Sequence, residues 1–409
     1  MNTSSTPGGT RGNIGNAICP RPCGFSRPDR RCGTLSFARS HFRIPKPSGF
    51  SHIPAPVIST TEELRDLASR VRHAPWVALD TEADSLHAYP EKLCLIQLAI
   101  PGEAALVDPL ADLHLESLWE ALDHREIIFH AADYDLRLLF QGHHFRPSAI
   151  FDTMWAARLI GEPKFGLNDV LTKMLGVTLE KGAQKANWGR RPLTERMVEY
   201  ALNDVRHLNE LTEKLRSRLQ ELGRLEWHRQ TCARLIADCA QPEQVDLDAV
   251  WRIKGHDRLD PLGLAILREL WHWREKDAVR SNKPPFFILR HETLSMIAAD
   301  AAERRTARNL RLPPYLTFKR RQGVIDAVQR GLEVPEADLP NHIRVRSRRM
   351  LKKELDLAEE LRIRRDERAA DVGIDPTLVA SKSTLYALAR KDPGSWEDLL
   401  PWQRGFLEP

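Results

Sequence analysis

A short apolar run that ends in acidic residues is the clearest structural signal in this chain. Residues 76–79, Trp-Val-Ala-Leu, are too few for a helix of their own and predict a buried strand, which continues into Asp80-Thr81-Glu82. Side chains alternate between the two faces of a strand, so Asp80 and Glu82 point the same way. After the turn at 89–90, the apolar residues 93–100 predict a second strand, and the two together predict a hairpin inside a sheet.

Short apolar runs and helical patterns alternate over the next part of the chain. Further strands are expected at 105–108, 126–130 and 149–153. Helices are expected after the capping sequence at 59–61, at 113–122, from 136 onward and at 154–160. This alternation predicts an α/β sandwich around a mixed sheet.

Two neighbouring carboxylates at the end of a buried strand are energetically unfavourable unless something compensates their charge. Asp80 and Glu82 repel each other and are costly to remove from water, and a hard divalent cation such as Mg²⁺ would relieve that repulsion. The alternative is a pair of edge or capping carboxylates that face water. Short acidic motifs often occur by chance, so this pair does not decide the question alone.

Two stretches further along the chain place acidic residues in informative positions. In the first, a strand turns into a helix and brings Asp133 and Asp135 to the C-terminal edge of the sheet, where sites of α/β proteins usually lie, although either could cap the helix. In the second, 195–211, an apolar helical stripe carries Tyr200 and Asp204 one turn apart on one face. They are either a metal-binding acid with a phenol that contacts an attacking water, or a surface Asp beside a half-buried Tyr.

Composition adds an uneven distribution of charge to this picture. Apolar residues make up 42% and charged residues 29% of the 409, and no apolar run is long enough to predict a membrane span. Residues 1–50 carry eight basic and one acidic side chain, 51–250 carry 22 and 31, and 251–409 carry 31 and 24. Basic flanks beside an acidic middle suit a polyanion held near a metal-binding carboxylate site, although solvated tails give the same pattern. The six cysteines form no paired framework, which fits a reducing compartment.

The two ends of the chain differ in kind. Residues 1–50 are rich in Gly, Pro, Ser and Arg and are predicted to be disordered, and the same composition also suits an organellar transit peptide or a misassigned start. From about residue 259 the pattern is helical and basic, and a weak internal repeat predicts two small helical domains. Without a gap, the repeat aligns Arg274, Ala278, Pro285, Leu294, Ile297 and Ala298 with Arg365, Ala369, Pro376, Leu385, Leu388 and Ala389.

Together, these stretches resemble the DEDD superfamily of 3′-to-5′ exonucleases and, within it, the ribonuclease D family. Asp80 and Glu82 are similar to the Asp-x-Glu of its first motif. Asp135, five residues after a His, is similar to the second motif, and Tyr200 with Asp204 to the third, Tyr-x-x-x-Asp. The sequences around them, such as DTEADSLHAYPEKLCLIQLA and QKANWGRRPLTERMVEYALNDVRHL, also resemble this family.

The resemblance implies a domain order. It implies a ribonuclease H-like exonuclease domain with a mixed sheet at 51–230, after the basic extension 1–50. Two HRDC-like (helicase and RNase D C-terminal) domains would follow, at 256–335 and 350–409. The match to the HRDC-like domains is looser than the match to the catalytic motifs.

The resemblance also implies a chemistry. Its four acids would hold two divalent cations, Mg²⁺ or Mn²⁺, and these acids are Asp80, Glu82, Asp135 and Asp204. Asp133 is then a neighbour and not a ligand, and Tyr200 would orient or deprotonate the attacking water. The expected substrate is structured RNA such as tRNA precursors, trimmed from the 3′ end with release of nucleoside 5′-monophosphates.

A polar loop before the third motif offers candidate substrate contacts. Its candidates are Gln184, Lys185, Trp188, Arg190 and Arg191. Arg could contact phosphate and Trp could stack on a base, or Trp188 could pack on the domain while the Arg side chains are solvated. The basic runs at 304–321 and 344–353 are further candidate phosphate-contacting surfaces, with solvated faces as the alternative.

Three functions are consistent with these residues. The first is a cytoplasmic 3′-to-5′ exoribonuclease whose partner is RNA, with no membrane and no stable protein partner. The second is a DNA exonuclease of the same fold. The catalytic motifs do not distinguish it from the first, because they bind phosphate and metal and not the 2′-hydroxyl. The third is a non-catalytic RNA-binding scaffold, which would normally have lost one of the four acids.

Overall fold

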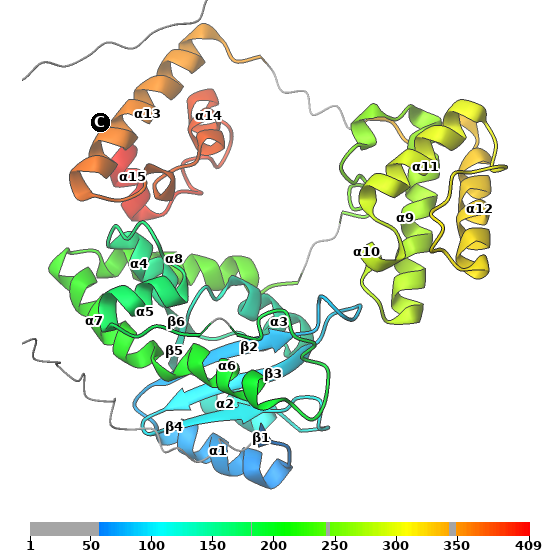
Figure 1. Ribbon diagram of the computed structural model, residues 1–409. Coiled ribbons are helices and arrows are strands. Elements are labelled where there is room, and N and C mark those ends of the chain that lie inside the picture. The colour runs from blue at the N-terminus through cyan, green and yellow to red at the C-terminus, as the bar shows by residue number, and fades with distance from the viewer. Residues whose placement is uncertain (1–56, 181, 243–245, 343–348) are drawn as a thin grey trace, which may run out of the picture. The chain divides into compact units, whose positions relative to one another are not determined.

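The computed structural model describes residues 57–180, 182–242, 246–342 and 349–409. The disorder predicted for 1–50 lies outside the described residues. The described part begins with an α/β domain and continues with two helical modules (Figure 1). None of its helices is both long and apolar enough to cross a membrane.

A six-stranded mixed sheet forms the centre of the α/β domain. Its strand order is β1-β4-β3-β2-β5-β6. The strands β2, β3 and β4 pair antiparallel, whereas the β1–β4, β2–β5 and β5–β6 pairs are parallel. The strands are β1 Val57–Ile58, β2 Val77–Ala83, β3 Leu93–Ile100, β4 Glu103–Val107, β5 Glu126–Phe129 and β6 Ala149–Asp152. The predicted mixed sheet and hairpin are therefore confirmed.

Helices cover both faces of this sheet. On one face, α1, α2 and α3 share an apolar core with Val77 and Leu79 of β2. On the other face, α6 lies across β2, β3 and β4, beside Leu95 and Leu106 (Figure 1). The helices of the domain are α1 Thr61–His73, α2 Glu116–Leu122, α3 Asp133–His143, α4 Thr153–Leu159, α5 Leu167–Leu175, α6 Glu195–Arg206, α7 Leu208–Glu221 and α8 Leu225–Cys239.

Local signals explain where several of these helices begin and end. Thr60 and Glu63 form a reciprocal capping box at the start of α1, as the sequence predicts. The prediction of one helix over 195–211 was wrong in one respect. The helix is interrupted at His207, which ends α6 and precedes α7. A second interruption separates α7 from α8, where Gly223 takes a left-handed conformation with φ 70°.

The two helical modules repeat one structural detail. Arg274 is 2% exposed and its Nη1 donates to the carbonyl oxygen of Leu289 at 3.3 Å. Arg365, its counterpart in the aligned repeat, is 9% exposed and donates from Nη1 to the carbonyl oxygen of Ala380 at 2.7 Å. A buried guanidinium that bonds an equivalent carbonyl in both copies supports the internal repeat.

The first module contains α9 Pro261–Ser281, α10 Pro285–Ile288, α11 His291–Arg304 and α12 Phe318–Leu332. The second contains α13 Lys352–Val372, α14 Lys382–Arg390 and α15 Pro401–Leu407. Short 3₁₀ turns occur at His256–Arg258, Glu336–Asp338 and Pro376–Leu378.

Candidate active site

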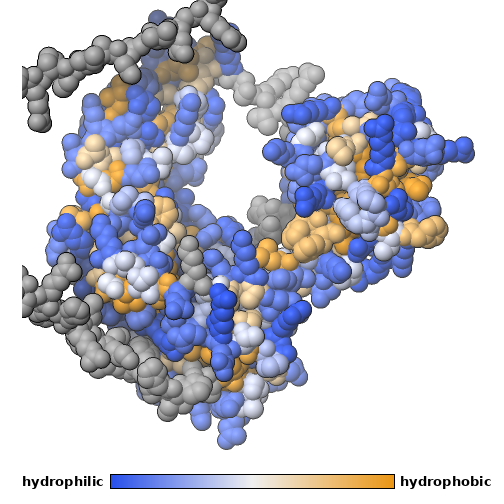
Figure 2. Space-filling model, in the orientation of Figure 1, coloured by the Kyte–Doolittle hydropathy of each residue, from blue (hydrophilic) through white to orange (hydrophobic). Residues whose placement is uncertain are grey.

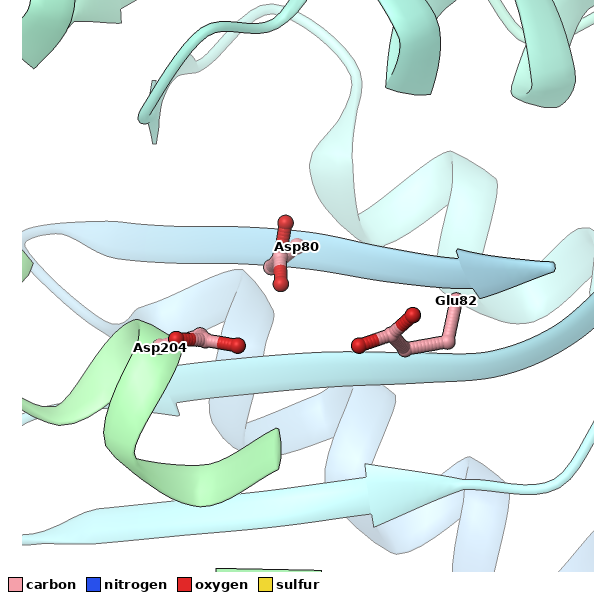
Figure 3. Close-up of side chains that lie close together, drawn as sticks. All are labelled: Asp80, Glu82 and Asp204. Carbon is pink, nitrogen blue, oxygen red and sulfur yellow. The ribbon is translucent and has the colours of Figure 1, made fainter. Parts of the chain in front are cut away.

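Three carboxylates from two elements meet on one face of the sheet. Asp80 and Glu82 extend from the same face of β2, and Asp204 approaches from α6 (Figure 3). One carboxylate oxygen from each lies within 4.8 Å of the other two. The alternation of β2 and the spacing of α6 therefore place these predicted residues together.

The apolar stripe of α6 decides which way its polar residues point. Met197, Ala201 and Val205 are buried against the sheet, and Thr194 caps the helix by accepting from the backbone N–H of Met197 at 3.3 Å. This orientation places Asp204 beside the buried stripe, with its carboxylate directed toward Asp80 and Glu82 (Figure 3).

Asp135 reaches the site from the opposite face of β2. It lies in the first turn of α3, is 5% exposed, and accepts a hydrogen bond of 2.5 Å from the hydroxyl of Thr81. It does not belong to the cluster of three, but the charge of Asp80 acts on it. Asp133, two residues earlier, is exposed.

Electrostatic repulsion and burial make this group of acids unfavourable without a cation. Burial, and then the charge of Asp204, raise the pKa of Asp80 to about 8. Burial, and then the neighbouring acids, raise the pKa of Glu82 to about 9. Burial also raises the pKa of Asp204 to about 7, against the effect of a hydrogen bond from Tyr200.

The same forces act on the fourth acid. Burial, and then the charge of Asp80, raise the pKa of Asp135 well above its usual range. Among the described residues, no Lys, Arg or His forms an ion pair with any of these four acids. Clustered carboxylate oxygens without a protein counter-charge fit a hard divalent cation, which prefers oxygen ligands.

Gln97 is a neighbour of the cluster that the sequence did not single out. It is paired with Asp80 across the antiparallel β2–β3 ladder and is 0% exposed. Neither side-chain amide atom has a hydrogen-bond partner among the described residues. Since buried amides are rarely left without partners, this one is an orphaned polar group beside the acids and adds to the fit for a hydrated ion. An uncharged residue on an apolar strand gives no sequence signal for this position.

Tyr200 stands one helical turn from Asp204, as the spacing predicts. Its hydroxyl lies close enough to the Asp204 carboxylate for a hydrogen bond between them to act on the pKa of both groups. Burial, and then the charges of the nearby acids, raise the pKa of Tyr200 further above its usual value. The chain also passes close to its ring at Gly182, where a Cβ would lie 2.1 Å from Tyr200 Cδ2, so only glycine fits there without displacement.

The polar loop before α6 packs against Tyr200, and only some of its candidate substrate contacts are exposed. Trp188 is 1% exposed and its ring lies 6.1 Å from that of Tyr200, centroid to centroid. A ring this buried offers no face to a base, so the geometry favours the packing alternative for Trp188 over the stacking contact. Gln184 and Lys185 are exposed and stay candidate substrate contacts.

Arg191 is held within the domain by an ion pair and by hydrogen bonds to backbone carbonyl groups. Its Nε and Nη2 donate to the two carboxylate oxygens of the buried Asp108 at 2.5 and 2.6 Å. Nη2 and Nη1 also donate to the carbonyl oxygens of Cys94 and Trp188. These bonds use the guanidinium that was expected to contact phosphate, whereas Arg190 is exposed.

Comparisons with known proteins agree on both parts of the chain. A family model described as a 3′-5′ exonuclease matches residues 56–220, and one described as an HRDC domain matches 263–310 and 354–401. A ribonuclease D of Jannaschia sp. is 32% identical over 346 residues, which cover 81% of this chain and 88% of that protein. A ribonuclease D of Gluconacetobacter diazotrophicus is 31% identical and covers 86% and 90%.

Solved structures agree with these relatives. Escherichia coli RNase D, described as an exoribonuclease involved in structured RNA processing, superposes with a TM-score of 0.65 at 25% identity, covering 85% of this chain and 92% of that one. A protein from Bifidobacterium adolescentis superposes with a TM-score of 0.72 at 24% identity and covers 88% and 97%, which supports the fold alone.

A mixed sheet that carries clustered acids, followed by repeated helical modules, defines a 3′-5′ exonuclease with C-terminal HRDC domains. Nucleic acid is the substrate class of such a protein. The chain belongs to the ribonuclease D family and is a 3′-5′ exoribonuclease. The resemblance and fold class inferred from the sequence are confirmed, whereas the domain boundaries and the site residues stay predictions.

Proposed function

We propose that this enzyme trims the 3′ ends of structured RNA such as tRNA precursors and releases nucleoside 5′-monophosphates by a two-metal-ion mechanism. The observation that carries the proposal is the cluster of Asp80, Glu82 and Asp204, whose oxygens lie within 4.8 Å of one another, with Tyr200 one turn from Asp204 on α6. Membership of the ribonuclease D family supports the reaction, and the description of the Escherichia coli relative supports structured RNA as the substrate.

The four acids share one task in this proposal, which is to hold the divalent ions. Asp80, Glu82 and Asp204 hold divalent ions, Mg²⁺ or Mn²⁺, and Asp135 completes the set from the other side of β2. When bound, such ions lower the pKa of a water and stabilise negative charge on the leaving 3′ oxygen.

Tyr200 orients the attacking water in this proposal. A phenol hydroxyl both donates and accepts hydrogen bonds, so Tyr200 can bond the Asp204 carboxylate and still accept a hydrogen bond from water. Without a cation, burial and the charges of the nearby acids raise the pKa of Tyr200 above its usual value, which favours the protonated phenol. Of the two roles that the resemblance allows, orienting the water and deprotonating it, this geometry favours the first.

The first HRDC module supplies a candidate RNA-binding surface. In the described part of the basic run 304–321, Arg308, Arg311 and Lys319 are exposed, and Tyr315 and Phe318 among them are 61% and 84% exposed. Exposed apolar side chains are also visible on this module in Figure 2. Basic residues interleaved with exposed aromatic rings suit phosphate contact combined with base stacking. Part of the second basic run, 344–353, lies outside the described residues.

A direct assay tests the catalytic part of the proposal. The substrate is a 5′-labelled tRNA with a 3′ trailer, incubated with Mg²⁺ or EDTA, beside a single-stranded DNA. We expect a metal-dependent ladder of products shortened from the 3′ end, and Asp204→Asn should lower the rate at least about 100-fold because a carboxylate aimed at the reacting centre is lost.

Asp133→Asn is the matched control for this assay. It removes the same charge two residues from Asp135, but Asp133 is exposed and lies outside the cluster. Its rate should stay within a few-fold of the wild type. Intact RNA that is nevertheless bound would favour the scaffold function, and faster loss of the DNA would favour the DNA exonuclease. The cytoplasmic location stays a prediction, supported by the unpaired, buried thiols of Cys94, Cys232 and Cys239.

A further inference from the structure

The carboxylate of Asp152 makes more hydrogen bonds than a helix cap requires. Asp152 is the last residue of β6 and is 0% exposed. Its Oδ1 accepts from the backbone N–H groups of Met154 at 2.8 Å and Trp155 at 3.1 Å, which is the normal cap of α4. The same carboxylate also accepts from the N–H of Ala131 at 3.2 Å and, through Oδ2, from that of Ala132 at 2.8 Å.

The second pair of hydrogen bonds holds an unfavourable turn. Ala131 has φ 64°, in the left-handed region that residues with a Cβ rarely adopt. The turn follows β5, whose Phe129 is paired with Asp152 in the sheet. Since Asp152 binds consecutive N–H groups within this turn, its carboxylate opposes relaxation of Ala131 toward an ordinary conformation.

This turn determines where α3 begins. Ala132 is the N-cap of α3 and no side chain of its own caps the helix. Asp135 lies in the first turn that follows, with its carboxylate bonded to Thr81 on β2. Asp135 is therefore held from two directions, by Thr81 at its carboxylate and by Asp152 through the backbone.

We propose that Asp152 is a positioning residue for Asp135, and that it keeps the Asp135 carboxylate in place to hold a divalent cation together with Asp80. The inference rests on the proposed metal-binding role of Asp135. Asp152 does not contact the cluster of three acids, so its effect passes through the turn at Ala131 and Ala132.

Two substitutions separate this role from capping. Asp152→Ser keeps a good N-cap for α4, but its single short hydroxyl lacks the second oxygen that reaches Ala132. Asp152→Asn keeps the shape of the side chain but replaces one acceptor oxygen by an N–H donor, so either the cap or the turn loses its partner. Both variants should weaken the hold on the turn, and Asp152→Ser should do so with α4 still capped.

The test measures metal binding without RNA and RNA cleavage separately, on the full-length chain. Mn²⁺ affinity is followed by calorimetry or electron paramagnetic resonance, and thermal unfolding confirms that each variant is folded at the assay temperature. Asp152→Ser should bind Mn²⁺ about 10- to 100-fold more weakly than the wild type, as is typical when a group that orients a metal ligand is lost. kcat should fall by a similar factor while KM for RNA changes little.

A double-mutant cycle shows whether Asp152 acts through Asp135. Once Asp135→Asn has removed the carboxylate, adding Asp152→Ser should cause no further loss of Mn²⁺ affinity. Leu138→Ala, which shortens a buried side chain on the same α3, is the control for general destabilisation and should leave Mn²⁺ affinity within a few-fold.

Each outcome bears on a different statement. If the wild type binds Mn²⁺ and cleaves RNA, but folded Asp152→Ser and Asp152→Asn bind Mn²⁺ equally well, the positioning role is wrong and the proposed function stands. Losses that are additive with Asp135→Asn, or matched by Leu138→Ala, would also overturn it. A wild type that neither binds Mn²⁺ nor cleaves RNA would refute the proposed function itself.

Discussion

Removing the hydroxyl of Tyr200 tests the role of this residue most directly. In Tyr200→Phe the ring can keep its place against Trp188 and Gly182, so the change removes one hydrogen-bonding group and little packing. The lost group lies beside the Asp204 carboxylate and, in the proposed function, accepts a hydrogen bond from the attacking water.

The expected loss follows from the strength of one hydrogen bond. A hydrogen bond to a charged group contributes about 1.5–3 kcal/mol, and a factor of ten in rate corresponds to about 1.4 kcal/mol. If this contribution is made mainly in the transition state, kcat falls about 10- to 160-fold and KM for RNA is nearly unchanged.

The assay is single-turnover release of the first nucleotide from a 5′-labelled RNA at saturating Mg²⁺, over a range of pH. Tyr134→Phe is the matched control, because the hydroxyl of Tyr134 also donates to a carboxylate, that of Glu91 at 2.7 Å, outside the cluster of acids. Its kcat should stay within a few-fold of the wild type.

The pH profile separates an orienting role from a general base. An orienting Tyr200 leaves the shape of the profile unchanged and lowers it uniformly. If Tyr200→Phe abolishes a limb of the wild-type profile, the hydroxyl titrates in the reaction and the orienting role is refuted. An unchanged kcat would refute any role of the hydroxyl in catalysis.

Two further predictions concern charge. In EDTA, the acids with pKa values of about 7 to 9 keep protons in the folded chain at pH values where the unfolded chain has lost them, so the free energy of unfolding should fall as the pH rises from about 4.5 and level off by about 9. Urea unfolding measures this fall, and saturating Mg²⁺ should reduce its slope, whereas stability that rises with pH in EDTA would contradict the prediction. Arg191→Ala should lower the free energy of unfolding by about 2–3 kcal/mol, because the buried Asp108 carboxylate loses its partner in an ion pair whose arginine is partly exposed. It should leave the salt dependence of RNA binding unchanged, and a reduced salt slope would identify a phosphate contact instead. In the control Arg190→Ala, the salt slope should fall and the free energy of unfolding should stay the same.

Local periodicity predicted the residue pairs that contribute to the acidic cluster, and the resemblance to the ribonuclease D family predicted that these pairs meet. The alternation of a strand placed Asp80 and Glu82 on one face, and a spacing of four residues placed Tyr200 beside Asp204 on a helix. These arguments use neighbours along the chain, and the structure brings carboxylate oxygens of three of these residues within 4.8 Å of one another.

Contacts between distant parts of the chain could not be predicted in this way. Thr81 and Asp135 are 54 residues apart, and Arg191 and Asp108 are 83 apart. Nothing in a polar loop sequence tells an arginine that binds phosphate from one that is paired with a buried aspartate. The interruption at Gly223 did leave a signal, since glycine often follows a helix end, but the helical pattern on both sides concealed it.

The residues around the acids have a common physical task. A cluster whose carboxyl pKa values are raised by burial and mutual repulsion tends to move its side chains apart when no cation is present. The packing of Gly182 against the Tyr200 ring and the hydrogen bonds that Thr81 and Asp152 make around Asp135 oppose that movement. Because these groups form no ion pair with the acids, they hold them in place without neutralising them, and a divalent cation can take the place of the protons that the acids keep in its absence. Metal affinity in this enzyme should therefore depend on these supporting residues as well as on the acids themselves.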